Sequence, residues 1–129
     1  DVRISIGIGK VTGTVQVLRT ANSEAFVLSG RMFDQLKDTQ CLWIQSAEEK
    51  ANIVFRVIAR FSDYLLKRLT PKQAEVVIEL LKGQTQAGIS GKLRKKQSTI
   101  NKHAHAAGWP EIEKLLYEYD QTIAQFNLI

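Results

Sequence analysis

Hydrophobic and polar residues alternate at the start of the chain. In VRISIGI (residues 2–8), valine and isoleucine hold the even positions, while arginine, serine and glycine hold the odd ones. A period of two predicts a strand with one buried face. The apolar run QCLWIQS (residues 40–46) predicts a second buried strand, and VQVLRT (residues 15–20) predicts either a short strand or an irregular extension.

Two segments around the second strand show the three- and four-residue spacing of helices. SEAFVLSGRMFDQLKD (residues 23–38) predicts a helix with Ser23 as its N-cap. Residues 47–69 predict an amphipathic helix of about 35 Å, at roughly 1.5 Å per residue. The residues expected to be buried on this long helix are Ala51, Val54, Phe55, Ile58, Phe61, Leu65 and Leu69.

The next helix carries its own start and stop signals. Thr70 is placed to cap it, Pro71 occupies its first position, and Gln73 completes a capping box. Gly83 follows the last turn, where a left-handed backbone favours glycine. The predicted buried stripe of this helix is Ala74, Val77, Ile78 and Leu81.

Two short helices and a longer one complete the pattern. The first covers residues 85–93 and contains Gly88 and Gly91, each of which costs roughly 1 kcal/mol relative to alanine. Either glycine would allow a close approach between helices. The second covers residues 97–107, and the last begins at Pro110 and ends near Phe126.

The whole pattern predicts an α+β chain in three parts. Residues 1–46 form a strand–helix–strand segment, residues 47–69 a connecting helix, and residues 70–129 an all-α module. Two or three strands and one helix cannot bury a sheet core by themselves. We therefore expect the first part to be the C-terminal half of a larger α/β domain, whose other strands lie upstream or come from another chain.

Positive charge is concentrated in the all-α module. Between Leu80 and Pro110, six of the 18 lysines and arginines occur without any aspartate or glutamate, which leaves 12 bases against all 13 acids elsewhere. A localised basic segment is the electrostatic footprint of a nucleic-acid partner, although a solvated surface can have the same composition.

Three consecutive helices, two of them short, are the layout of a helix-turn-helix unit. The segment TQAGISGKLRKKQSTINKHAHAAG (residues 85–108) resembles the helix-turn-helix of bacterial transcription regulators. The apolar residues of the two short helices are expected to pack on the stripe of the preceding helix and to hold the second one out as a rigid rod. The matching positions are Gln86, Ile89, Leu93, the turn Arg94–Lys96, Ser98 or Thr99, and Ile100.

The exposed side of this second short helix carries the residue types that read duplex DNA. Gln and Asn pair with adenine through two hydrogen bonds, and Lys reaches the acceptors of guanine. Hydroxyl groups and a helix N-terminus suit phosphate groups. Additional lysine and arginine side chains would add positive charge against the phosphate backbone of DNA. The candidate DNA-binding residues are Lys92, Arg94, Lys95, Lys96, Gln97, Ser98, Thr99, Asn101, Lys102 and His105.

The match departs from the usual pattern at three positions. Arg94 stands where the turn usually has glycine, because the backbone there is left-handed, and this costs about 1 kcal/mol. Lys95 replaces an aliphatic residue, so its stem is expected to lie on the core while its charge reaches water. Ala104 replaces a larger apolar residue.

Other chemistry is weakly indicated. His103 and His105 are two residues apart on a helix, so they face different ways and cannot share a metal ion; we expect a half-buried His103 and an exposed His105. Cys41 is the only cysteine and predicts a buried thiol in a cytoplasmic protein. GIGKVTG (residues 7–13) has neither P-loop nor dinucleotide-binding spacing. No cofactor is expected, and no apolar run approaches the roughly 18 residues of a membrane span.

The first part also has a family resemblance. RISIGIGKV, SEAFVLSGRMF and CLWIQS, in this order, resemble the second half of a class III nucleotide-cyclase-like domain, which implies a partial ferredoxin-like core. In that family an Asn precedes an Arg by four residues, and both serve the transferred phosphate. Here Arg31 matches, but Val27 stands in place of the Asn, so the resemblance implies a fold rather than an activity. Both halves together resemble the C-terminal part of SatD-like bacterial proteins, which join a degenerate cyclase-like region to a helix-turn-helix.

These patterns predict a bacterial transcriptional regulator, and not an enzyme, that binds duplex DNA through its helix-turn-helix. One alternative is a protein-interaction module without DNA binding, in which the helices from Ala47 and from Pro110 are the seams of a homodimer. Another is a divergent nucleotide cyclase. That activity needs paired carboxylates on strands, and the visible strands have none apart from Asp1.

Overall fold

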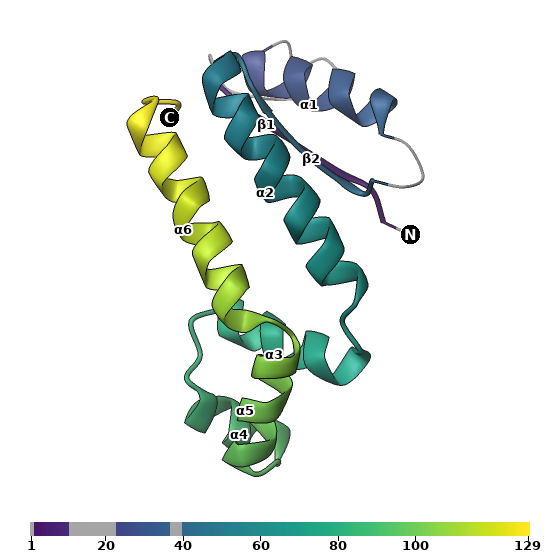
Figure 1. Ribbon diagram of the computed structural model, residues 1–129, viewed down its shortest axis with the longest axis vertical. Helices are drawn as coiled ribbons and strands as arrows, with labels where there is room; N and C mark the ends of the chain where they lie inside the picture. Colours follow the sequence, from purple (N-terminus) through teal and green to yellow (C-terminus); the bar gives the residue numbers. More distant parts are fainter. Residues whose placement is uncertain (1, 11–22, 37–39) are drawn as a thin grey trace. The chain divides into compact units, whose positions relative to one another are not determined.

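The computed structural model describes residues 2–10, 23–36 and 40–129, so the strand considered for residues 15–20 lies outside the described residues (Figure 1). The chain is α+β, as predicted, and divides into two compact units, residues 1–63 with 115–129 and residues 64–114. In chain order the elements are β1 (Ile4–Ile8), α1 (Glu24–Gln35), β2 (Leu42–Ser46), α2 (Glu49–Lys67), α3 (Pro71–Leu81), α4 (Gln86–Leu93), α5 (Gln97–Ala106) and α6 (Trp109–Gln125).

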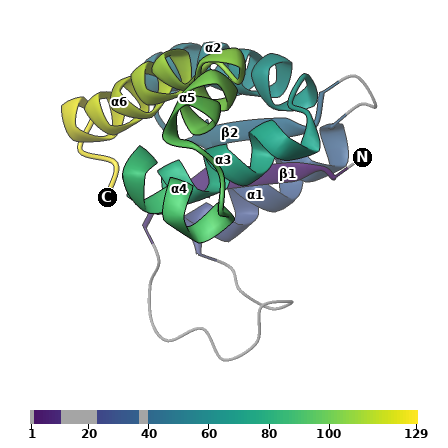
Figure 2. The ribbon, with the colours of Figure 1, turned by 90° about the horizontal axis from the view of Figure 1, so that it is seen from below.

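The first unit is built on a strand–helix–strand crossover. β1 and β2 pair in parallel, with Ile4 opposite Leu42 and Ile8 opposite Ser46. Parallel neighbours cannot be joined by a tight turn, and α1 lies on the connection between them. Figure 2 shows α1 on one face of this sheet and α2 on the other.

The core of the first unit lies between the sheet and α2. Ile8 and Ile44 of the strands meet Phe55 and Ile58 of α2 in one buried cluster. The second half of α6 packs against the same cluster, and the ring of Tyr119 lies 5.8 Å from that of Phe55. Residues from both ends of the chain therefore share one core.

Several residues expected to be buried in this unit are not. On β1 only Ile8 is buried, whereas Ile4 is 49% exposed. Val2, which precedes the strand, is 76% exposed. The cause is that the cluster under α2 reaches Ile8 and Ile44 but does not include the start of β1. Phe61 of α2 is also exposed, and Cys41 is half-buried rather than buried.

Gly7 allows α1 to lie directly against β1. A Cβ atom at this position would collide with the backbone oxygen of Ala25 and lie 2.8 Å from the backbone nitrogen of Ser29. Both are backbone atoms of α1, so the helix would have to move. The closeness of α1 to the strand thus depends on this glycine.

Replacing Gly7 with alanine is expected to lower the free energy of unfolding by about 1–3 kcal/mol, the usual cost of overpacking. Gly30→Ala is the matched control, because Gly30 lies on α1 with no atom within 4 Å of an added Cβ. That change is expected to raise stability by about 0.5–1 kcal/mol. Urea denaturation of the two variants measures both values, and equal effects would contradict the close approach at Gly7.

Candidate nucleic-acid interface

The second unit places two short helices, α4 and α5, on α3. Ile89 of α4 and Ile100 of α5 are fully buried together with Val76 of α3 and Ala104 of α5. Leu93 packs on the edge of this cluster, as do Leu80 and Trp109. The three apolar residues expected to anchor the short helices therefore do so.

The side of α3 that receives them differs from the prediction. Val77 is buried, but in a separate cluster with Ala107 and Ile112, while Ile78 and Leu81 are 50% and 52% exposed. The cause is that α3 is covered on two sides, through Val76 by α4 and α5 and through Val77 by the second cluster. Residue spacing alone predicted a single buried side for α3.

Capping residues set the limits of α3 as predicted. The Thr70 hydroxyl accepts from the Gln73 backbone N–H, and the Gln73 side chain accepts from the Thr70 N–H at 2.9 Å. After α3, Gly83 takes the left-handed conformation with φ 80°. Gln84 N–H then donates to the Glu79 carbonyl and Gly83 N–H to that of Leu80, which is the pattern of a Schellman motif.

The turn between α4 and α5 repeats this motif without glycine. Arg94 has φ 51° and ψ 43°, the left-handed conformation expected at this position. Lys95 N–H donates to the Ser90 carbonyl at 3.1 Å, and Arg94 N–H donates to that of Gly91. The Ser90 hydroxyl also donates to the Lys95 carbonyl. These bonds fix the turn from which α5 departs.

The two glycines of α4 do not serve helix packing, contrary to one expectation. An added Cβ at Gly91 would meet no atom within 4 Å, and at Gly88 it would meet only the side chains of Gln84 and Thr85. Gly88 instead donates its N–H to the capping hydroxyl of Thr85 at 3.1 Å.

Two of the candidate DNA-binding lysines are engaged by carboxylates of α3. Lys92 Nζ lies 2.7 Å from Glu79 Oε2, and Lys95 Nζ lies 3.6 Å from Glu75 Oε2. Lys82, another base of the acid-free segment, lies 3.0 Å from the other oxygen of Glu79. These carboxylate partners were not among the predicted features, although the three-residue spacing of Glu79 and Lys82 is a visible signal of such a pair.

Glu79 is a buried carboxylate stabilised by its two lysines. Hydrogen bonds from Lys92 and then from Lys82 hold the pKa of this carboxyl below its ordinary value of 4.5, against the opposing effect of desolvation. A lowered pKa in the folded state means that ionised Glu79 stabilises the fold above the ordinary carboxyl range. This stabilisation is lost as the pH falls through the lowered folded-state pKa.

Glu79→Gln is expected to lower the melting temperature at neutral pH, because it removes the charge that holds both lysines. The difference from the parent protein should shrink as the pH falls below the ordinary carboxyl pKa of 4.5. Glu75→Gln is the matched control, since the Glu75 side chain is 58% exposed and should show a smaller difference. Thermal unfolding followed by circular dichroism over this pH range measures the effect; a difference independent of pH would contradict it.

The other candidate residues form an exposed polar face. On α5, Ile100 and Ala104 are buried while Gln97, Ser98, Asn101, Lys102 and His105 are exposed, as the spacing predicted. Thr99 and His103 are half-buried. Arg94 and Lys96 are exposed beside the start of the helix, and within the described part of the chain no carboxylate pairs with Arg94, Lys96 or Lys102.

The N-terminus of α5 lacks the side-chain cap that α3 and α4 have. Thr70 and Thr85 cap α3 and α4 with their hydroxyls, whereas Lys96 at the same position of α5 makes no side-chain capping bond. The first backbone N–H groups of a helix point outward and carry partial positive charge. At α5 they lie among exposed cations.

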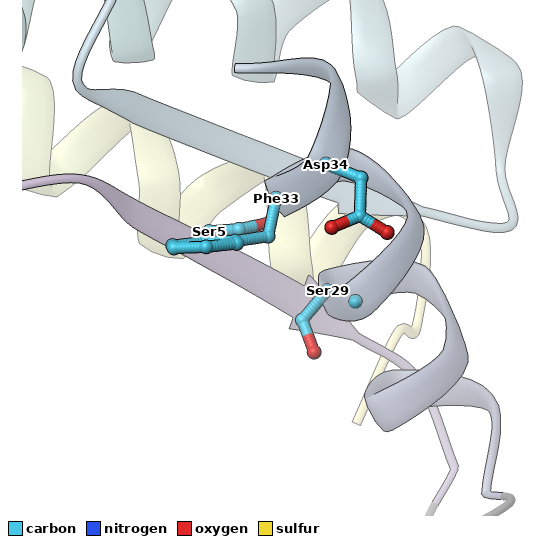
Figure 3. A pocket seen from close by; sticks show the side chains of 5 residues that line it. Ser5, Ser29, Phe33 and Asp34 are labelled. Atoms are coloured by element: carbon cyan, nitrogen blue, oxygen red, sulfur yellow. The ribbon is translucent and has the colours of Figure 1, made fainter.

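The hollow described in the first unit offers no acid–base chemistry. A shallow hollow between β1 and α1 is lined by Ser5, Ser29, Gly30, Phe33 and Asp34 (Figure 3). Asp34 is the only ionisable residue of this lining, so the hollow has no acid–base pair. Among residues 2–10, 23–36 and 40–129, no three His, Cys, Asp or Glu side chains lie close enough to share a metal ion.

Comparisons with protein-family models, curated proteins and solved structures returned no match to this chain. Within the described ranges, the helices are all too short or too polar to cross a membrane.

Proposed function

We propose that α3, α4 and α5 form a helix-turn-helix unit that binds duplex DNA, with α5 as the recognition helix, and that the protein is a bacterial transcriptional regulator. The observation that carries the proposal is the division of α5 into two sides. Ile100 and Ala104 anchor it in a buried apolar cluster, while an acid-free polar side faces solvent. A helix held in this way can enter the major groove without rearrangement.

The exposed residues divide into two roles. Gln97 and Asn101 carry amides that pair with adenine, and Lys102 reaches guanine acceptors. Arg94, Lys96, Ser98 and the uncapped N-terminus of α5 suit the phosphate backbone. Lys92 and Lys95 contribute less, because Glu79 and Glu75 already compensate part of their charge.

For the first unit we retain the cyclase-like resemblance as part of the proposal. The chain order strand–helix–strand is that of half a ferredoxin-like domain, although that split unit has a further strand between its two strands, whereas β1 and β2 pair directly here. After β2, α2 leads into the proposed DNA-binding unit, as in SatD-like proteins. Val27 in place of an Asn argues against phosphate chemistry on α1. We therefore propose a structural role for this unit, without cyclase activity.

Binding to mixed-sequence duplex DNA at low salt tests the proposal directly. Fluorescence anisotropy with the double variant Lys96→Ala/Lys102→Ala should show a clear loss of affinity. The matched control is Lys72→Ala/Lys114→Ala, which removes the same charge from exposed lysines of α3 and α6. No binding by the parent protein, or equal losses in the two double variants, would overturn the proposal.

A further inference from the structure

The outer side of α2 carries apolar side chains that nothing in the described structure covers. Ile53, Val57 and Phe61 follow one another at intervals of four residues, and each is more than half exposed. This spacing places them on one side of the helix, away from the buried Phe55 and Ala59. The helix is therefore apolar on two opposite sides.

The charge beside this outer stripe is positive. Lys50, Arg56 and Arg60 are exposed on the same helix. Asp63, by contrast, is buried, and its carboxylate accepts a hydrogen bond from the backbone N–H of Cys41 at 2.7 Å. Within residues 49–63, Glu49 is the one acidic residue that is exposed.

The outer side of α6 in the same unit has the opposite charge. Leu116 and Tyr117 are 44% and 61% exposed, and Asp120 is exposed one turn further along. From Leu115 to Ile129 the sequence has two acids, Glu118 and Asp120, and no lysine or arginine. Like α2, this half of α6 presents apolar side chains, but beside carboxylates.

Both helices cover the same core. Tyr119 of α6 packs on Phe55 of α2, so the two outer sides belong to one helical layer of the first unit. In that layer, α2 presents exposed apolar side chains flanked by cations, and α6 presents exposed apolar side chains flanked by carboxylates. Its charge pattern is therefore complementary to itself.

We propose that this layer binds a second copy of the chain, with α2 of one protomer against α6 of its partner around a twofold axis. A twofold axis repeats the contact, so each basic apolar side meets an acidic one. Pairing α2 with α2 would instead bring Arg56 and Arg60 against their own copies. An anionic membrane would attract α2 but repel Glu118 and Asp120. The surface lies in the first unit, so the inference does not depend on DNA binding.

Two charge-reversal variants test this pairing. Arg60→Glu and Asp120→Lys change exposed residues, and each places like charges against each other twice in the proposed dimer. Analytical ultracentrifugation of the parent protein should show a monomer–dimer equilibrium, and each variant alone should remain monomeric. An equimolar mixture of the two variants should dimerise again. At one contact the carboxylate introduced on α2 would face the ammonium group introduced on α6, and at the other contact the native pair would form.

Circular dichroism separates lost association from lost folding, since both variants should retain the helical spectrum of the parent protein. A parent protein that stays monomeric at high concentration would overturn the inference. So would a dimer that Asp120→Lys leaves intact, because α2 would then pair with something other than α6. A mixture that stays monomeric while the parent protein dimerises would equally exclude the α2–α6 contact.

Discussion

Replacing Ile100 with alanine should lower the free energy of unfolding of the second unit by about 2–5 kcal/mol, the range observed when large buried side chains are truncated. The side chain is fully buried and packs with Val76 and Ile89, so its loss leaves a cavity at the junction of α3, α4 and α5. Because this junction orients α5, DNA binding should fall together with stability. Urea denaturation and DNA titration of the same preparation measure both.

Asn101→Ala provides the control at the adjacent position. Asn101 is exposed on α5, so stability should change by no more than about 0.5 kcal/mol. Affinity for DNA should still fall, because the lost amide belongs to the proposed recognition side. An Asn101 variant that binds as well as the parent protein, or an Ile100 variant of unchanged stability, would contradict this division of roles.

Arg94→Gly should have opposite effects on stability and on binding. The left-handed conformation at Arg94, with φ 51°, costs an arginine about 1 kcal/mol that glycine avoids, so the variant should be more stable by a similar amount. Loss of the guanidinium should weaken DNA binding by about tenfold, since hydrogen bonds to charged groups contribute about 1.5–3 kcal/mol. Such a result would explain why the turn after α4 has an arginine at its left-handed position, whereas the equivalent turn after α3 has Gly83.

Asn127→Gly is a control that places glycine at a left-handed position outside the proposed DNA-binding surface. Asn127 has φ 47° after α6, with the same two hydrogen bonds as the turn at Arg94. Asparagine tolerates this conformation, so glycine should change stability by only a few tenths of a kcal/mol, with no effect on DNA binding. If Arg94→Gly left affinity unchanged, the arginine would have no part in the interface.

Helix limits in the second unit were predictable because their causes are local. The capping box of Thr70 and Gln73, the left-handed Gly83 and even the left-handed Arg94 depend on residues within one turn of each other. The exposed side of α5 was predictable for a similar reason. Once Ile100 is taken as buried, helical spacing alone places Asn101 and Lys102 in solvent.

Long-range packing was not predictable in the same way. Spacing shows that α3 is apolar but not that two clusters divide it, which is why Val76 was missed and Ile78 was wrongly expected to be buried. The return of α6 to the core of the first unit depends on Tyr119 meeting Phe55, and these residues lie far apart in the sequence.

The candidate site shows the same limit. Lys92 and Lys95 belong to a segment of the sequence without acidic residues. In the folded chain, however, Glu79 of α3 forms an ion pair with Lys92, and Glu75 of α3 forms one with Lys95. Charge counted along the chain therefore overstates the charge available to an anionic partner. Arg94, Lys96 and Lys102 have no such partner among the residues that the structure describes, so they are the stronger candidates.

The salt dependence of DNA binding tests the central claim most directly. A plot of log affinity against log salt concentration should be linear, with a slope that reflects the phosphates neutralised. Removal of one phosphate contact should reduce the magnitude of the slope by about 0.9. We expect Lys96→Ala to show this reduction and Lys72→Ala to keep the parent slope. Equal slopes for all three proteins, or affinity independent of salt, would contradict DNA binding through the turn and face of α5.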